Sequence, residues 1–558
     1  MGTVTDADLI LTNGVVYTVD AGRSRHAAVA LRDGRVAAVG SAPEVAALRG
    51  PRTEVVDLDG RLVLPGFVDS HLHPKFCTSA LYEVDLSGCR SLRACLDALA
   101  RFAAERPQMP AYRGGGWFPT EVPESEMTAA AIDSVVADRP VSLFDDSQHS
   151  QWVNSATLRL LGVGSDDPPW DGAVVERLPG GSPSGLLREA WPWVEAVLPQ
   201  YDAAAKIAGL RHFQREIAAR YGLTLLHEAG LSPGEAMFTA YRSLEELGEL
   251  TARYCISVEL DPGRPAAELV AGAVGERARD AGPLVRTAAV KLFTDGVLES
   301  HTGYVSTPYA DRPGFRSAPV WEPERLIEVS VAAAAAGFQL HYHAIGDAAV
   351  SLSLDAIAAA RPRGRRDDAR DILTHLQLVD PRDYARMADL GVTAATQPYW
   401  FAKDAAYDAQ IYRPFLGDDR AAHQYPMRSF FEHGVLVTAA SDFPVSPPPD
   451  PLLAIQRGAL RRDPLQPESS SELWPEEAVG VEQLIAAFTV NGARANFLEH
   501  ETGSLEPGKS ADLVVLSADI LALPPERTHE AEVRLTMFRG APVFAAAEYA
   551  GLAGARPR

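Results

Sequence analysis

Two histidines that stand two positions apart are the first residues in this sequence whose spacing suggests chemistry. His71 and His73 lie in the segment PGFVDSHLHP, where an apolar run predicts a β-strand. Because alternate residues of a strand point to the same face, both imidazoles can reach a single metal ion. Two histidines packed in a core would produce the same pattern, so the pair alone is compatible with either interpretation.

Four further residues have side chains that could join this pair around a metal. Lys291 lies in AAVKLFTDG, His343 in QLHYHAIGD, His375 in ILTHLQ and Asp442 in TAASDFPV. Imidazole and carboxylate ligands without thiolates suit zinc, iron, cobalt or manganese, and zinc is the default expectation. The sequence therefore suggests a site for divalent cations.

Lys291 is unusual in this set, because a dication repels an ammonium group and a buried lysine tends toward its neutral form. A neutral amine can add carbon dioxide to form a carbamate, which is an anion with two oxygens that can bridge two metal ions. The alternative interpretation is an ordinary lysine that forms a salt bridge with Asp295.

The elements that must position these residues are typical of a parallel α/β sheet. Continuous apolar segments alternate with helical stretches such as 325–336, which indicates buried strands covered by helices. Eight strands are expected, at 62–70, 223–229, 252–260, 286–294, 338–344, 371–375, 391–397 and 435–441. They predict a closed (β/α)₈ TIM-like barrel. The candidate ligands would then meet at the carboxyl ends of its strands, where active sites of this fold lie.

Both ends of the chain predict antiparallel strands. Dipeptides that accept positive φ are the strongest local signal for a hairpin. Three tight turns are expected, at Asn13-Gly14, at Asp33-Gly34 and near Arg539-Gly540. We therefore expect a small composite β-sandwich domain from residues 1–61 and 500–558, and a barrel domain over 62–499.

A large insertion is expected after the first barrel strand, at 76–215. It is too long for a loop and has its own helical patterns, so it predicts a subdomain over the barrel mouth. Five of the eight tryptophans lie in it, at Trp117, Trp152, Trp170, Trp191 and Trp193. Either they form the core of the subdomain, or one or two of them roof the active site.

The composition excludes several classes of function. The chain has 558 residues, of which 46% are hydrophobic and 23% are charged, and its net charge is −22. Such a charge repels phosphate backbones and anionic lipid, so neither nucleic acid nor a membrane is expected as a partner. The four cysteines lack CxxC spacing and the N-terminus lacks a signal-like pattern, which favours a cytoplasmic protein. An exposed apolar face on the β domain would permit a homodimer.

The motifs PGFVDSHLHP, VKLFTDG, HAIGD, THLQ, SDFPV and GSLEPGKSADLVVL occur in an order that resembles the amidohydrolase superfamily. Within it, the chain is most similar to the amidohydrolase family 3 group, which includes the N-substituted formamide deformylases. The resemblance covers nearly the whole chain and implies a binuclear metallohydrolase. It implies that one ion is held by His71, His73 and Asp442 and the other by His343 and His375, with carboxylated Lys291 as the bridge.

The sequence departs from the family pattern in two places. DGVLESHTGY at 295–304 has His301 where relatives often carry an arginine, and the second strand ends in HEAG rather than an Asp-Ala-Gly type. Both departures concern the substrate pocket and not the metal ligands. His341 shares a pleat face with His343 and is the alternative residue of that pair, placed behind the ligands by the resemblance.

The expected reaction is hydrolysis of an amide-like carbon–nitrogen bond, N-acyl or N-formyl, in a small molecule. A metal-activated hydroxide would attack, Asp442 would carry the proton to the leaving amine, and His301 or His149 would help to stabilise the oxyanion. Candidate substrate contacts are Trp117, Trp152, Asp295, Gln397 and Tyr399.

Two alternatives stay open at this point. One is a mononuclear deaminase or cyclic amidase on the same barrel, against which Lys291 argues because such deaminases usually lack a lysine ligand on the fourth strand. The other is a non-enzymatic relative that kept the barrel as a scaffold. Chemically intact ligand positions argue against that relative.

Overall fold

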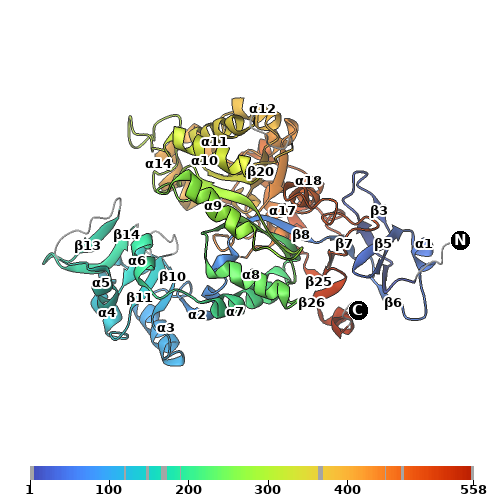
Figure 1. Cartoon of the computed structure of the whole chain (residues 1–558), viewed down its shortest axis with the longest axis horizontal. Coiled ribbons are helices and arrows are strands. Elements are labelled where there is room, and N and C mark those ends of the chain that lie inside the picture. Colours follow the sequence, from blue (N-terminus) through green and yellow to red (C-terminus); the bar gives the residue numbers. More distant parts are fainter. Residues whose placement is uncertain are drawn as a thin grey trace. The chain divides into compact units, whose positions relative to one another are not determined.

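A computed structural model describes residues 6–118, 121–145, 150–164, 173–188, 190–361, 368–446, 448–466 and 470–554. Residue contacts divide the chain into two compact units (Figure 1). The first unit comprises Met1–Pro74 and His212–Arg558, and the second comprises Lys75–Arg211.

An eight-stranded parallel sheet forms the centre of the first unit. Its strands are β8 (Phe67–Leu72), β15 (Leu223–Leu231), β16 (Arg253–Glu259), β17 (Val285–Phe293), β18 (Gln339–Ala344), β19 (Ile372–His375), β20 (Thr393–Thr396) and β22 (Leu436–Ala439). They are hydrogen-bonded in this order from β8 to β22. Beyond β22 the backbone N–H of Asp442 donates to the carbonyl of His71, at 2.9 Å, which brings the two ends of the sheet together. The expected barrel is confirmed.

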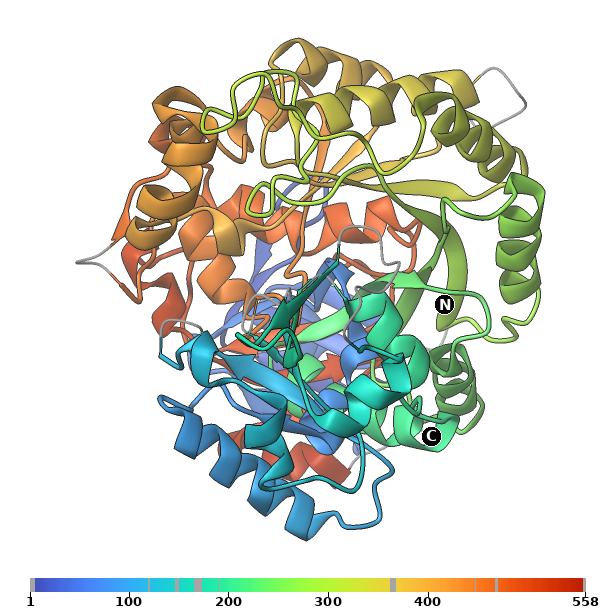
Figure 2. The ribbon, with the colours of Figure 1, turned by 90° about the vertical axis from the view of Figure 1, so that its left-hand side faces the viewer.

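Helices follow the strands and cover the sheet from outside (Figure 2). The main ones are α8 (Ala236–Glu246), α9 (Ala266–Arg277), α10 (Pro323–Ala335), α11 (Asp347–Ala360), α12 (Arg382–Asp389), α16 (Arg428–Glu432), α17 (Pro451–Leu460), α18 (Val481–Ala487) and α19 (Val490–Ala495). The strands are buried over almost their whole length because helices and barrel interior cover both faces. Within the described ranges, no helix combines the length and the apolar content that crossing a membrane requires.

The first expected strand, 62–70, is two strands in the structure. Strand β7 (Leu62–Pro65) pairs with strands from the chain ends, and β8 begins the barrel. Gly66 lies between them. This position requires glycine, because a Cβ there would lie 2.2 Å from Thr224 Oγ1. The barrel therefore begins at Phe67, and the expected boundary at residue 62 is wrong.

Two further sheets of the first unit come from the chain ends, the first from N-terminal strands alone and the second from strands of both ends. One has the order β5-β4-β1-β6, with β1 (Leu9–Thr12), β4 (Ala28–Arg32), β5 (Arg35–Gly40) and β6 (Glu54–Asp57). The other has the order β26-β25-β24-β7-β2-β3, with β2 (Val15–Tyr17), β3 (Arg25–His26), β24 (Leu513–Leu516), β25 (Val533–Phe538) and β26 (Ala541–Ala545). A shared core includes Leu11, Val63, Leu513 and Leu535.

The structure confirms two of the three expected hairpins. Register pairs join Arg32 to Arg35 and Phe538 to Ala541, on either side of their two-residue turns. The hairpin expected at 13–14 is wrong, because β1 and β2 belong to different sheets. Asn13 adopts a φ of 58°, and the chain uses this conformation to pass from one sheet to the other.

The second unit has a sheet of its own with the order β13-β14-β12-β11-β10-β9. Its strands are β9 (Glu83–Asp85), β10 (Tyr112–Trp117), β11 (Val141–Asp145), β12 (Ser150–Val153), β13 (Val174–Arg177) and β14 (Pro183–Arg188). Its helices include α3 (Leu92–Glu105), α4 (Ala129–Asp133), α5 (Ser155–Leu161) and α6 (Trp191–Val197). A subdomain over the barrel mouth stays a prediction.

Candidate metal centre

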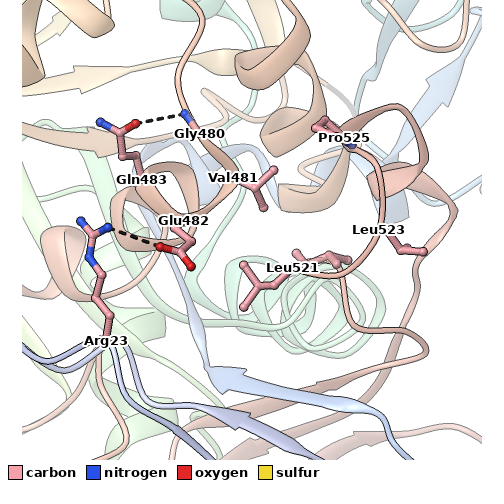
Figure 3. A pocket seen from close by; sticks show the side chains of 9 residues that line it. Arg23, Gly480, Val481, Glu482, Gln483, Leu521, Leu523 and Pro525 are labelled. Atoms are coloured by element: carbon pink, nitrogen blue, oxygen red, sulfur yellow. Dashed lines mark hydrogen bonds and ion pairs between the residues drawn. The ribbon is translucent and has the colours of Figure 1, made fainter.

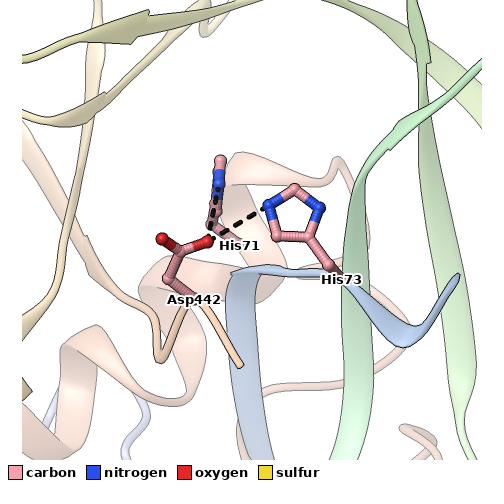
Figure 4. Close-up of side chains that lie close together, drawn as sticks. All are labelled: His71, His73 and Asp442. Carbon is pink, nitrogen blue, oxygen red and sulfur yellow. Dashed lines mark ion pairs between the residues drawn. The ribbon is translucent and has the colours of Figure 1, made fainter. Parts of the chain in front are cut away.

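His71, His73 and Asp442 form a compact group of ligand atoms at the carboxyl ends of β8 and β22 (Figure 4). One nitrogen or oxygen from each residue lies within 4.8 Å of the other two. Asp442 Oδ1 is 3.4 Å from His71 Nε2 and 3.2 Å from His73 Nε2. His71 is fully buried, whereas 15% of the His73 side chain is exposed. This geometry leaves one position that all three residues can reach.

The backbone around Asp442 explains how its carboxylate comes to face the histidines. Asp442 adopts a φ of 58°, which is uncommon for residues other than glycine and occurs often at functional sites. The carboxylate of Asp69, on β8, accepts hydrogen bonds from the backbone N–H and the hydroxyl of Ser441, at 3.0 and 2.5 Å. His73 N–H donates to the carbonyl of Phe443, at 2.8 Å. These bonds hold the turn after β22 against the strand that carries the histidine pair.

His343 and His375 form a second pair on β18 and β19. Their ring centroids are 4.4 Å apart, and the His375 centroid is 5.1 Å from that of His71. His343 Nε2 donates to the carbonyl of Gly296, at 3.1 Å, which leaves Nδ1 as the nitrogen that could bind a metal. His375 adopts a φ of 75°, a second strained position in the cluster.

Lys291 lies on β17 among these imidazoles and is only 1% exposed. Burial and, next to it, the charge of Lys291 lower the pKa of His71 and of His343, the latter to about 3. In the register of β17 and β18, Lys291 lies opposite His341, two residues before His343. The structure thus brings all six predicted ligands to one end of the barrel.

The charge state of Asp442 suits a metal ligand. Burial acts to raise its pKa, but the hydrogen bond from His73 and the electrostatic interactions with His375, His73 and Lys291 outweigh burial, so the pKa is lowered. Asp442 is therefore a carboxylate at neutral pH. Asp69 differs, since burial outweighs its hydrogen bonds and raises its pKa to about 7.

Two buried nitrogens in the cluster indicate that it fits a divalent cation. His71 Nε2 and His375 Nδ1 have no hydrogen-bond partner among the described residues. A buried polar atom without a partner destabilises the fold unless a ligand or water satisfies it. Imidazoles with a carboxylate are the donor set that zinc and similar ions prefer.

Trp117 and Trp152, expected to contact the substrate, serve instead as core residues of the second unit. Both are fully buried in a cluster with Cys95, Met127 and Leu143. Trp117 Nε1–H donates to the carbonyl of Leu143, at 3.2 Å, and Trp152 Nε1–H to that of Thr128, at 2.9 Å. These rings therefore have no surface left for a substrate, and the core interpretation holds. His149 and Trp170 lie outside the described residues.

Asp295 and Gln397 both follow barrel strands, but their side chains bind protein groups. Asp295 is buried and accepts three backbone N–H groups, from Tyr304, Ile345 and Gly346. Burial raises its pKa to about 7 against these bonds. Gln397 Nε2 donates to Thr374 Oγ1, at 3.0 Å. Asp295 thus holds the turn that follows β18, and Gln397 Nε2 binds β19 beside His375, whereas Gln397 Oε1 has no hydrogen-bond partner among the described residues.

His301 and Tyr399 have surroundings that the sequence did not reveal. His301 Nε2 is 2.8 Å from Asp311 Oδ2, and its ring lies 3.9 Å from that of Phe415. Tyr399 is only 4% exposed, and its ring meets Phe488 edge-on. Tyr399 is thus buried, its hydroxyl has no hydrogen-bond partner among the described residues, and its contact with substrate stays a prediction.

The aromatic ring beside the candidate ligand His375 belongs to Trp400, which the sequence analysis did not single out. It stacks on His375 with a centroid distance of 5.5 Å and an interplanar angle of 19°. Its Nε1–H donates to Ser446 Oγ, at 2.7 Å. The PYW segment forms a 3₁₀ turn at Pro398–Trp400, in which neighbouring side chains point in different directions. The sequence position alone could therefore not show whether Tyr399 or Trp400 lies beside the candidate ligands.

Glu228 is a second residue whose place only the structure reveals. It is fully buried on β15 and accepts a hydrogen bond from the Tyr241 hydroxyl, at 2.9 Å. Its Oε1 is 3.9 Å from His73 Nδ1. Glu228 belongs to the HEAG segment, and the departure of this segment from the family pattern is the sequence feature that could have drawn attention to Glu228.

A separate cavity of about 570 Å³ is lined by Arg23, residues 480–483, Ile520, Leu521, Leu523 and Pro525 (Figure 3). The cavity contains an ion pair, in which Arg23 Nη1 is 3.4 Å from Glu482 Oε2, so these two opposite charges compensate each other. None of the six candidate ligands lines this cavity. This cavity is therefore separate from the candidate metal site.

Comparison with known proteins agrees with this geometry. The model of the Amidohydrolase family matches residues 54–544. The amidohydrolase YtcJ of Bacillus subtilis is 29% identical over 95% of this chain and 98% of its own. The N-substituted formamide deformylase of Arthrobacter pascens is 28% identical over 96% and 97%. An uncharacterized metal-dependent hydrolase from Pyrococcus horikoshii has a similar fold, with a TM-score of 0.75, 24% identity and coverage of 93% and 99%. This chain therefore belongs to the amidohydrolase family and is a hydrolase that acts on carbon–nitrogen bonds.

Proposed function

We propose that this enzyme hydrolyses the carbon–nitrogen bond of a small amide-like substrate, N-acyl or N-formyl. The observation that carries the proposal is the meeting of His71 Nε2, His73 Nε2 and Asp442 Oδ1 around one position, beside Lys291 and a second histidine pair. The name of the formamide deformylase relative supports the choice of an amide-like bond.

Two divalent ions, most simply zinc, fit this donor set. His71, His73 and Asp442 would hold one ion and His343 and His375 the other. Lys291 would bridge them as a carbamate, because an anion is favoured where an ammonium would be repelled. A bound ion of this kind supplies a water that is acidic enough to yield a nucleophile near neutral pH.

Asp442 is the proposed proton carrier. Its lowered pKa keeps it deprotonated at neutral pH, and its Oδ1 faces the position shared by the two histidines. It would take the proton from the attacking water and return it to the nitrogen of the leaving amine. His301 and His149 stay proposed donors to the developing oxyanion. His301 would have to use Nδ1, since its Nε2 is engaged with Asp311.

Metal analysis combined with a substrate screen tests this proposal. The purified enzyme should contain about two divalent ions per chain and should hydrolyse members of a panel of N-formyl, N-acyl and cyclic amides. One ion per chain together with ammonia release from amino-substituted rings would instead support the mononuclear deaminase. Stoichiometric metal without hydrolysis of any amide or ester would refute the proposal.

The proposed location of the enzyme is the cytoplasm, and its proposed assembly is a homodimer. Cys77, Cys89, Cys95 and Cys255 are all buried free thiols, in keeping with a cytoplasmic enzyme. A homodimer stays a prediction, which the mass of the particle in solution tests.

A further inference from the structure

A chain of buried polar side chains runs from His71 across the inside of the barrel. His71 Nδ1 is 2.8 Å from His341 Nε2, and His341 Nδ1 is 3.0 Å from Ser257 Oγ. Ser257 Oγ is 2.8 Å from His227 Nε2, and His227 Nδ1 is 2.8 Å from Asn496 Oδ1. These residues come from β8, β18, β16, β15 and the end of α19. Because β8 and β18 are not neighbours in the sheet, the bond between His71 and His341 crosses the barrel interior.

The far end of the chain sets the direction of every hydrogen bond in it. Asn496 Nδ2 donates to the carbonyl of Gly492, at 2.9 Å, so its Oδ1 must face His227 and accept from Nδ1–H. Burial lowers the pKa of His227 to about 4, so its ring is neutral at pH 7 and Nε2 carries a lone pair. The Ser257 hydroxyl therefore donates its only proton to His227. It is then left to accept from Nδ1–H of His341.

The hydrogen-bond directions at His341 determine the tautomer of the candidate ligand His71. No carboxylate belongs to this chain of five residues, so a second proton on His341 would be a buried charge without a partner in the chain. His341 Nε2 is then a lone pair, and His71 must donate to it from Nδ1–H. In the opposite tautomer of His71, two lone pairs would face each other at 2.8 Å. The lone pair of His71 consequently lies on Nε2, which is 3.4 Å from Asp442 Oδ1.

We propose that Asn496, His227, Ser257 and His341 are positioning residues that hold His71 in its Nδ1–H tautomer and so present Nε2 as a metal ligand. The inference rests on the proposed function for the occupant of the site. The tautomer itself is a property of the metal-free protein. Each link is buried, so loss of one link leaves two polar atoms unsatisfied and releases every ring between the break and the metal site.

Ser257→Ala tests the chain at its centre, and Ser330→Ala is the matched control. Ser330 is equally buried and hydrogen-bonded, to Leu326 O and to the hydroxyl of Tyr342, but it lies on α10 outside the chain. In metal-free protein labelled with nitrogen-15 histidine, long-range NMR correlations report which ring nitrogen of His71 carries the proton. His71→Asn assigns that resonance.

Wild type and the Ser330→Ala control should show Nδ1–H for His71. Ser257→Ala should show mixed tautomers and should bind zinc about 10- to 100-fold more weakly in competition with a chelator. If Ser257→Ala does not fold, Asn496→Ala breaks the chain at its far end and should cause the same loss in the same direction. Nε2–H in the wild type, or zinc affinity in Ser257→Ala equal to the control, would overturn the inference. Failure of the proposed function would appear separately, as wild-type protein that does not hydrolyse any amide of the panel.

Discussion

Two regions of the molecule contain buried residues that the sequence marks for function, and they differ in how their polar atoms are satisfied. In the second unit, the indole N–H groups of Trp117 and Trp152 donate to backbone carbonyls. In the barrel, His71 Nε2 and His375 Nδ1 have no partner within the described part of the chain. The first pattern is that of a finished core, whereas the second is that of a site prepared for a ligand. Burial alone does not distinguish the two.

The largest effect that this comparison predicts is on Asp442. Asp442→Asn keeps the shape of the side chain but removes the charge and the proton-accepting oxygen, so turnover should fall about 10³-fold or more. Most of the bound metal should stay, because the histidines are intact. Steady-state kinetics and metal analysis measure both quantities, with the exposed Asp419→Asn as a control. Turnover near that of the control would exclude Asp442 as the proton carrier.

Lys291→Ala should cause the next largest loss. Without the bridging group, metal content and activity should both fall, the activity by about 10²-fold. Short carboxylates added to the assay should restore part of the activity by replacing the carbamate. Lys509→Ala is the control, since that lysine lies far from the barrel ligands and binds Ser504 and Glu506. A fully metallated and active Lys291→Ala would show that the bridge assignment is wrong.

The core of the second unit should respond to mutation in the opposite way. Trp152→Phe removes part of a fully buried ring and its hydrogen bond to Thr128, so the free energy of unfolding should fall by about 2 to 3 kcal/mol. KM of the folded enzyme should not change. Trp191, on α6, is 49% exposed, and Trp191→Phe should have little effect in the same denaturation experiment. A raised KM with unchanged stability in Trp152→Phe would contradict the core interpretation and show that this ring contacts the substrate.

The smallest predicted effect concerns His227 and pH. Its pKa is lowered to about 4 by burial, so the unfolded chain binds more protons than the folded protein between that value and the ordinary pKa near 6.5. Stability is therefore complete above pH 6.5 and declines as the pH falls toward 4. The metal-free protein should lose about 1 to 2 kcal/mol more between pH 7 and pH 5 than His227→Gln. Equal losses in urea denaturation would mean that His227 is already protonated in the folded state.

The barrel could be predicted because its strands are continuous apolar runs, and such runs are typical of strands that are covered on both faces. The position of the six candidate ligands at one end of the barrel could be expected for the same reason, since residues at the carboxyl ends of parallel strands meet at one rim. The hairpin expected at Asn13-Gly14 failed because the same dipeptide conformation can join two sheets. The continuous strand expected at 62–70 was wrong for a related reason, since the close approach of Thr224 to Gly66 is a contact between distant parts of the chain.

The packing of the rings around the site also depends on contacts that the local sequence does not reveal. Tyr399 and Trp400 are neighbours in the sequence, yet one packs in the core against Phe488 and the other stacks on His375. His341 shares a pleat face with His343, and only the bond to His71 reveals what it contacts. Side-chain direction in short turns depends on packing, which a local pattern does not contain.

The sequence by itself determined which residues could act, because residue type and the spacing of apolar runs are local properties and the order of the strands follows from them. Only the tertiary structure decided which tryptophans are core and which ring nitrogen of His71 is available for a metal. Those outcomes depend on hydrogen bonds and contacts between residues that are far apart along the chain, such as Asn496 and His227. Folding brings such groups together, and no pattern within a single segment records it.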